Sequence, residues 1–366
     1  MRSKGTVDLP LHGGRAPRWL FEKMVKLSRC ITEIMIEEYG RKEFLERITD
    51  PYWFQALSCT IGFDWHSSGT TTTTCGALKV ALDPQEHGIV FLGGKGKASM
   101  KTPDEITTME EHFSLPPKIY DELSHTSRLV AKIDNSCIQD DYNLYHHSFI
   151  LAETGDWGVI QQGMDTDTGY ARRYHWLSNE IKELIVEPHK GVCCDRKEYD
   201  VLNMTERTSE EARKISVDLI NDDPDHIRKY FRKHGQTTLT GFREEIEMPS
   251  RHQVVDMDIS SEGWKTLKRA YEFQPSDYEE MVSLKGMGPK KIRALALVSD
   301  LIYGSEPSWK DPVKYSFAHG GKDGIPYPVD EEVYDNTIEN LRCVLEKTEI
   351  QEKTKKRALK RLSELI

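Results

Sequence analysis

The stretch from Lys132 to Leu177, KIDNSCIQDDYNLYHHSFILAETGDWGVIQQGMDTDTGYARRYHWL, decides the fold. It contains three runs rich in β-branched and aromatic residues, separated by short segments of glycine, threonine and aspartate. That composition is typical of antiparallel strands joined by turns. We therefore predict a β-meander with strands at Tyr145–Glu153, Trp157–Met164 and Tyr170–Leu177. The segments around it have helical periodicity, so the expected class is α+β and mostly helical.

Acidic, imidazole and amide side chains are concentrated in and before the first two strands of the meander. Carboxylates and imidazoles are the ligands of Mg²⁺ or Mn²⁺ sites that activate water against phosphodiesters. The candidate catalytic residues are Asp134, Asp140, Asp141, His147, Glu153 and Gln162, and the candidate metal ligands among them are Asp134, Asp141 and Glu153. The alternative is a polar sheet surface whose acids cap turns and whose histidines bond to neighbouring groups.

This pattern is loosely similar to restriction-endonuclease-type cores, which place a carboxylate before a hairpin that carries a glutamate and a lysine. Gln161 or Gln162 would stand in the place of that lysine, and the two face opposite sides of the predicted strand. On the third strand Arg172, Arg173 and His175 could hold the phosphate. The resemblance implies cleavage of DNA with a divalent cation.

A second informative stretch runs from Ser276 to Tyr303, SDYEEMVSLKGMGPKKIRALALVSDLIY. Ser276 and Glu279 have the S-x-x-E spacing of a capping box, which predicts a short helix from Asp277 to about Ser283. Two glycines separated by a methionine follow, and they permit a tight turn. The proline after them suits the first position of a second helix.

Three cations stand in the opening turn of this second helix, where positive charge opposes the helix dipole unless an anion lies in front. The stretch resembles the helix-hairpin-helix family, in which amides of a glycine-hydrophobic-glycine turn hold a DNA phosphate. The resemblance implies sequence-independent DNA binding. The residues it assigns to DNA binding are Lys285, Gly286, Gly288, Lys290, Lys291 and Arg293. An ordinary helical hairpin with a solvated basic face is the alternative.

The chain has 366 residues, enough for two or three domains, and a formal net charge of −10. This charge argues against a protein that coats nucleic acid over its whole surface, although it permits a local basic footprint. We predict a helical region at 1–88 with a Ser/Thr-rich loop and an α+β domain at 89–200 with the meander. A helical domain at 201–366 would carry the helix-hairpin-helix at 276–303.

The Ser/Thr-rich loop, from Gly62 to Leu82, leads into a short helix. Hydroxyls and amides before a helix N-terminus could receive a phosphate. Asp64 and His66 at its start could position water or a metal. A hydroxyl-rich capping turn is the alternative.

No run approaches eighteen apolar residues, and the N-terminus lacks the apolar segment of a signal peptide. We therefore expect a cytoplasmic protein without a membrane partner, and homo-oligomers are compatible with these features. The seven cysteines lack a C-x-x-C pair, so neither a disulfide framework nor a thiolate zinc site is expected. His189 with Cys193, Cys194 and Asp195 could ligate a metal, but a plain loop is the favoured interpretation.

Several runs, LPLHGG, DPYWFQAL, GFDWHSSGTTT, LYHH, QQGM, ARRYHWL and AHGGKDGIPYPVD, resemble a family of archaeal and bacterial proteins whose function is unknown. The resemblance extends over nearly the full chain. It implies no activity, so the functional argument depends on the individual residues.

Three functions are compatible with these residues. The favoured one is a metal-dependent nuclease that acts on DNA in repair or recombination, with Mg²⁺ or Mn²⁺ at the meander. The second is a helix-hairpin-helix glycosylase or lyase, with Lys290 or Lys291 as amine nucleophile and Asp300 or Asp311 as its acid partner. The third is a noncatalytic DNA-binding protein, in which the polar loops are structural.

Overall fold

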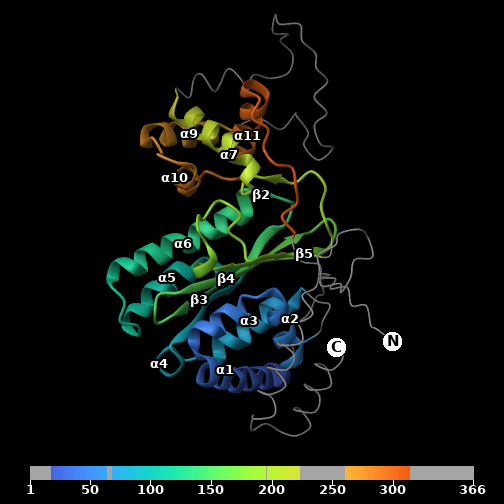
Figure 1. Cartoon of the computed structure of the whole chain (residues 1–366), viewed down its shortest axis with the longest axis vertical. Helices are drawn as coiled ribbons and strands as arrows, with labels where there is room; N and C mark the ends of the chain where they lie inside the picture. The colour runs from blue at the N-terminus through green and yellow to red at the C-terminus, as the bar shows by residue number, and fades with distance from the viewer. Residues whose placement is uncertain (1–17, 64–67, 195, 223–259, 314–366) are drawn as a thin grey trace, which may run out of the picture.

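A five-stranded antiparallel sheet in the order β1-β3-β4-β5-β6 is the centre of the molecule (Figure 1). The structure is a computed structural model that describes residues 18–63, 68–194, 196–222 and 260–313. The strands of this sheet are β1 (Ile89–Lys95), β3 (Asn143–Ala152), β4 (Trp157–Asp165), β5 (Tyr170–Leu177) and β6 (Gly191–Cys193). A second pair, β2 (Ile138–Gln139) and β7 (Leu202–Asn203), lies beside it.

The predicted β-meander is confirmed as β3, β4 and β5. The first strand begins two residues earlier than predicted and ends one residue earlier, and the third has the predicted bounds. Gly155, in the turn between β3 and β4, has a φ of +88°, which a residue with a Cβ rarely adopts. The sheet also contains β1, which pairs antiparallel with β3.

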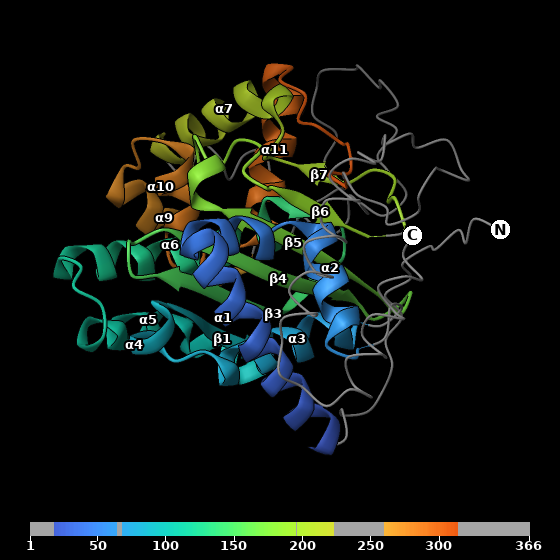
Figure 2. The same cartoon turned by 60° about the horizontal axis from the view of Figure 1, so that its bottom comes forward.

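One face of the sheet is covered by helices from the N-terminal part of the chain (Figure 2). They are α1 (Arg18–Ile48), α2 (Pro51–Thr60) and α3 (Gly69–Ala81), and α4 (Pro84–His87) leads into β1. Leu27 and Phe44 of α1 share a hydrophobic core with Ile89, Phe91 and Ile150 of the sheet. The boundary predicted at residue 88 therefore lies within a shared core.

The Ser/Thr-rich segment differs from its prediction. The sequence predicts Thr70 to Thr74 in a loop before a helix, but α3 begins at Gly69 and includes all five threonines. Thr71 and Thr74 are fully buried and bond to side chains of β4 and α2. These tertiary contacts outweigh the low intrinsic helix propensity of threonine. Asp64 and His66 lie outside the described residues.

The opposite face of the sheet is covered by α5 and α6, and a helical unit stands beside α6 at the end of the sheet (Figure 1). The two covering helices are α5 (Thr102–Thr108) and α6 (Pro117–Ser136). The helical unit consists of α7 (Glu210–Asn221), α9 (Ser261–Phe273), α10 (Tyr278–Ser283) and α11 (Pro289–Tyr303). One core joins Phe149 and Trp176 of the sheet to Leu267 and Leu295 of this unit.

The chain returns from α11 to the sheet through residues 304–313. Ser308 forms an antiparallel bridge with Asn203, whose amide donates to the Ser308 carbonyl at 2.8 Å. Asp311 then reaches Arg172 of β5. The segment that follows α11 is thus tied to β7 through Ser308 and to β5 through Asp311. None of the helices in the described ranges is long and apolar enough to cross a bilayer.

Candidate nucleic-acid interface

The first helix of the predicted hairpin, α10, is capped one residue later than its sequence indicates. Asp277, not Ser276, is the N-cap, and its Oδ1 accepts a hydrogen bond of 2.8 Å from the Glu280 amide. The Glu280 carboxylate in turn accepts from the Ser276 amide at 2.7 Å. The prediction that Ser276 and Glu279 form the capping box is therefore wrong by one position. A carboxylate at the N-cap also interacts favourably with the helix dipole, which a hydroxyl does not.

The turn between α10 and α11 requires glycine. Gly286 has a φ of +90°, and a Cβ there would lie 2.9 Å from Oγ1 of Thr266 on α9. Met287, between the two glycines, is fully buried in the core beside α9. The buried methionine anchors the turn, so Lys285 and Gly286 remain exposed on its outer side.

The N-terminus of α11 is open to an anion. Its N-cap, Gly288, has no side chain to accept from the first amides, the first residue is Pro289, and no acid occupies the first turn. Unpaired amides at such an end carry a partial positive charge. Four cations gather around it: Lys285, Lys290, Lys291 and Arg293. In the described ranges, none of these four takes part in a salt bridge.

Side chains of α6 and β2 form hydrogen bonds with the backbone at this end of α11. Lys132 Nζ donates to the Leu284 carbonyl at 2.5 Å, and Gln139 Nε2 donates to the Pro289 carbonyl at 2.9 Å. Gln139 also accepts from Arg293 Nε at 2.6 Å. Burial, together with the nearby charge of Lys291, lowers the pKa of Lys132 to about 8. An anion bound here would therefore meet a helix end that these hydrogen bonds hold in place and around which several cations lie close together.

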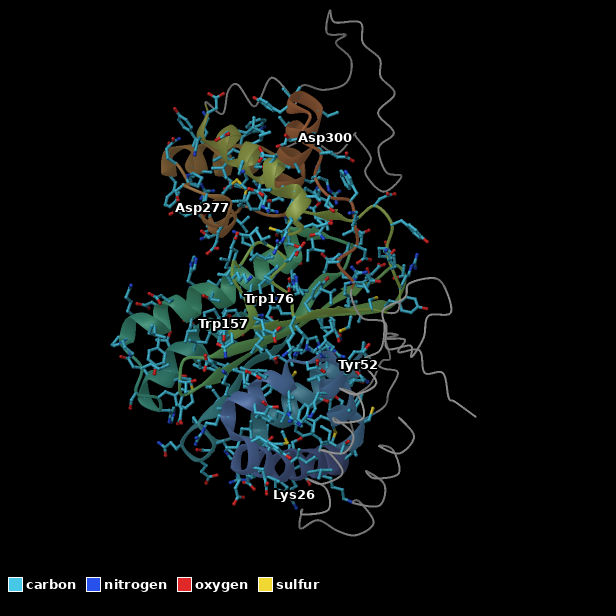
Figure 3. The ribbon with its side chains drawn as sticks, viewed as in Figure 1. Lys26, Tyr52, Trp157, Trp176, Asp277 and Asp300 are labelled. Atoms are coloured by element: carbon cyan, nitrogen blue, oxygen red, sulfur yellow. The ribbon has the colours of Figure 1, made fainter. Side chains whose placement is uncertain are left out.

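Asp134, the first candidate catalytic residue, is fully buried on the sheet face that α6 covers. It accepts three hydrogen bonds, from Gln161 Nε2 at 2.5 Å, Trp176 Nε1 at 2.9 Å and His189 Nε2 at 2.5 Å. Trp176 lies between the sheet and α6 (Figure 3). The partners of Asp134 thus occupy both carboxylate oxygens.

His147 continues the same buried network. Its Nδ1 contacts Gln161 Oε1 at 2.8 Å, and its Nε2 contacts Ser127 Oγ of α6 at 2.9 Å. Burial lowers the pKa of His147 to about 4, so the imidazole is neutral at neutral pH. A continuous chain of hydrogen bonds therefore leads from Ser127 through His147 and Gln161 to Asp134.

Asp140 belongs to a separate buried cluster around Arg172. Its Oδ2 accepts from Arg172 Nη1 at 2.8 Å and from the Tyr174 hydroxyl at 2.7 Å. The same guanidinium donates to both carboxylate oxygens of Asp311, at 3.0 and 2.8 Å. Burial raises the pKa of Asp140 to about 6 against the opposing effect of Arg172. The sequence suggests that Arg172 holds a phosphate, but in the structure it binds two carboxylates.

Gln162 and Arg173 lie on the other face of the sheet, beneath α2 and α3. Gln162 Nε2 donates to the Ser68 carbonyl at 2.8 Å, and its Oε1 accepts from the Thr71 hydroxyl. Arg173 lies 4.7 Å from the centre of the Phe54 ring and donates to a side chain of α2. Gln161 and Gln162 therefore face opposite sides of β4, as the strand period predicts. The set of candidate catalytic residues is split between the two faces.

The three candidate metal ligands do not share one site. Asp141 is exposed just before β3, with a φ of +68°, whereas Glu153 is exposed just after it and pairs with Arg41 at 3.3 Å. The ten residues of β3 separate the two acids by roughly 30 Å. Asp134 is buried in between. Among the described residues, no three His, Cys, Asp or Glu side chains gather as a metal site would require.

The segment around Cys193 and Cys194 includes strand β6 and is also structural in the described part. His189 bonds to Asp134, whereas the fully buried Cys193 lies near Arg173. Burial raises the pKa of the Cys193 thiol to about 12, which disfavours the thiolate that binds metals. His189 lies in a loop, as the favoured interpretation predicts, whereas Cys193 is the last residue of strand β6, and Asp195 lies outside the described ranges.

Sequence reasoning missed the partners of two buried charges. His189 lies 55 residues after Asp134, and Asp311 lies 139 residues after Arg172. No motif of fixed spacing links either pair, so no local signal could have found them.

The chain belongs to the family described as "Protein of unknown function (DUF763)", which matches residues 5–329. Neither the curated proteins nor the solved structures contain a match to it. Family membership therefore leaves the function to be argued from the site.

Proposed function

We propose that this protein binds DNA through α10, α11 and the turn between them, and that it contacts backbone phosphates without reading bases. The observation that carries the proposal is the uncapped N-terminus of α11, around which four cations lie without a salt-bridge partner among the described residues. The resemblance of this stretch to helix-hairpin-helix proteins supports the same interpretation.

The charge distribution favours an anion from outside the chain. Cations elsewhere on the surface are commonly paired, as Lys214 is with Glu210 and Glu211 at 2.8 Å each. Lys285 and Lys290 are exposed and have no such partner in the part of the chain described here. Four cations around a positive helix end raise the free energy of the isolated protein, the nearby Glu262 and Asp141 offset this only in part, and a phosphate lowers it further.

The shape of the turn favours the backbone of DNA over its bases. The exposed groups are amides and long cationic side chains, while Met287 is buried. Such groups position a phosphate but cannot distinguish base pairs, whose edges must be reached by side chains in a groove. Binding should therefore be independent of sequence and strongly dependent on salt.

The catalytic alternatives have less support from the geometry. The polar residues proposed for a nuclease lie in two buried networks and at two exposed strand ends, so metal-dependent cleavage stays a prediction of the sequence. For a lyase, Asp311 is salt-bridged to Arg172, and Asp300 lies ten residues beyond Lys290, about 15 Å along α11. Neither acid is therefore placed beside the hairpin lysines.

The test is a double charge reversal with a matched control. Lys290→Glu with Lys291→Glu should weaken binding to labelled duplex DNA at least tenfold for every sequence. It should also reduce the slope of log K against log salt by roughly one unit for each phosphate that the variant no longer neutralises. The control is Lys97→Glu with Lys101→Glu, an equal charge change on exposed lysines near β1. If both variants bind DNA equally weakly, the hairpin does not bind the phosphates.

A further inference from the structure

Helix α9 lies directly against the hairpin turn. Thr266 of α9 occupies the space where a side chain of Gly286 would be. The exposed side of α9 carries three cations, Lys265, Lys268 and Arg269. These cations come from a segment that does not belong to the hairpin, and Arg269, three residues after Thr266, shares the helix face that meets the turn.

Glu262, in the first turn of α9, is the acid among these cations. Its carboxylate lies 3.4 Å from Lys265 Nζ and 3.2 Å from Arg269 Nη2. Its charge also reaches Lys291 at the N-terminus of α11, where it opposes the lowering of the lysine pKa by burial. The charge of Arg269 instead lowers the pKa of Lys291. Glu262 and Arg269 of α9 are therefore both close to the hairpin site.

We infer that α9 is a second wall of the DNA-binding surface, and that Glu262 is an internal competitor which a backbone phosphate displaces from Arg269 and Lys265. This inference depends on the proposed function, because it assigns further residues to the same site. The displaced pairs are exposed, with more than half of each side chain accessible to solvent, and such pairs stabilise a fold little.

A phosphodiester suits the vacated cations. It has one negative charge and two free oxygens, which a guanidinium can bind through two parallel hydrogen bonds. DNA presents one phosphate per nucleotide, so a strand with one phosphate at α11 has a neighbouring phosphate available for α9. The exchange replaces an intramolecular carboxylate by a phosphate and leaves Glu262 exposed to solvent.

The experiment compares two isosteric substitutions on one helix. Glu262→Gln should raise the affinity for a labelled DNA duplex about three- to tenfold at low salt and steepen the salt dependence by about one unit. Glu272→Gln removes the same charge from an exposed position in the last turn of α9 and should change neither. A purely structural role of Glu262 at the start of the helix would lower the melting temperature without changing the salt slope.

A second substitution identifies the cation that is released. Adding Arg269→Gln to Glu262→Gln should remove most of the gain in affinity, because the vacated guanidinium is then absent. The inference is overturned if Glu262→Gln behaves like Glu272→Gln, or if Arg269→Gln leaves the gain intact. A different result would contradict the proposed function itself, namely that Lys290→Glu with Lys291→Glu does not weaken DNA binding.

Discussion

Arg172 and Arg293 show how differently two regions of this molecule use the same side chain. Arg172 is fully buried in the sheet and is neutralised by Asp140 and Asp311. Arg293 is half-buried in the helical unit, where its described hydrogen-bond partner is the uncharged amide of Gln139. A cation whose charge is already neutralised inside the protein has little capacity to bind an external anion. The comparison therefore supports a structural role for the sheet and favours the hairpin as the binding surface that we propose.

The same contrast applies to the acids. Asp134 and Asp140 have their oxygens occupied by donors from distant parts of the chain, and both are fully or nearly fully buried. Buried carboxylates of this kind need their partners to remain charged. The exposed acids near the hairpin, Glu262 and Asp141, instead reduce the positive potential of the surface that we propose for DNA.

The largest effect expected from this comparison is on stability. Replacing Arg172 by Met leaves two buried carboxylates without their cation and should lower the free energy of unfolding by about 3–5 kcal/mol. Arg293→Met removes one hydrogen bond and should cost about 1 kcal/mol. Urea denaturation measures both values. The opposite order is expected for DNA affinity, which Arg293→Met should weaken more than Arg172→Met does. Equal losses of stability in the two variants would contradict the division into two regions.

The next effect is on the pH dependence of stability. Burial raises the pKa of Asp140 to about 6, so the folded protein binds its proton more tightly than the unfolded chain does. The resulting stability is fully present below about pH 4 and is lost as the pH rises through 6, by up to about 3 kcal/mol.

The Asp140→Asn variant isolates this contribution, because the amide cannot titrate. The difference in unfolding free energy between wild type and variant should therefore change between about pH 4 and pH 6 and be flat outside that range. A difference that is constant across this window would show that Asp140 titrates at an ordinary pKa, and that Arg172 compensates fully for its burial.

The sequence predicts those features that depend on neighbours along the chain. The meander follows from alternation and turn residues, and its strands are correct to within two residues because these signals are local. The hairpin helices follow likewise from caps, glycines and a proline. The cap itself is misplaced by one position because Ser276 and Asp277 are both good N-cap residues, and only the fold decides between them.

The roles of the polar residues could not be predicted in the same way. A strand pattern states which face His147 or Gln162 is on, but not whether a helix covers that face. Asp134 acquires its role from His189 and Trp176, and both lie more than forty residues away along the chain. The sequence therefore suggests catalysis for Asp134 and Asp140, and only the fold reveals the buried hydrogen-bond partners of each.

The smallest expected effect separates the two interpretations of Asp141. As a metal ligand of a nuclease, this acid would be essential for cleavage. In the structure it lies close enough to Arg293 to raise the pKa of the guanidinium against the larger, lowering effect of burial, so it weakens the field of the proposed interface. Asp141→Asn should therefore raise DNA affinity about two- to threefold, the size expected of one exposed charge.

The substitution is well suited to its position. Asp141 has a φ of +68°, and asparagine adopts this left-handed conformation readily, so the variant should unfold at the same temperature as wild type. Asp104→Asn, an equal charge change on the exposed part of α5, controls for net charge and should leave affinity unchanged. If Asp141→Asn instead abolishes a Mg²⁺-dependent cleavage of DNA without altering affinity, the acid is catalytic, and the division between a structural sheet and a binding hairpin fails at this residue.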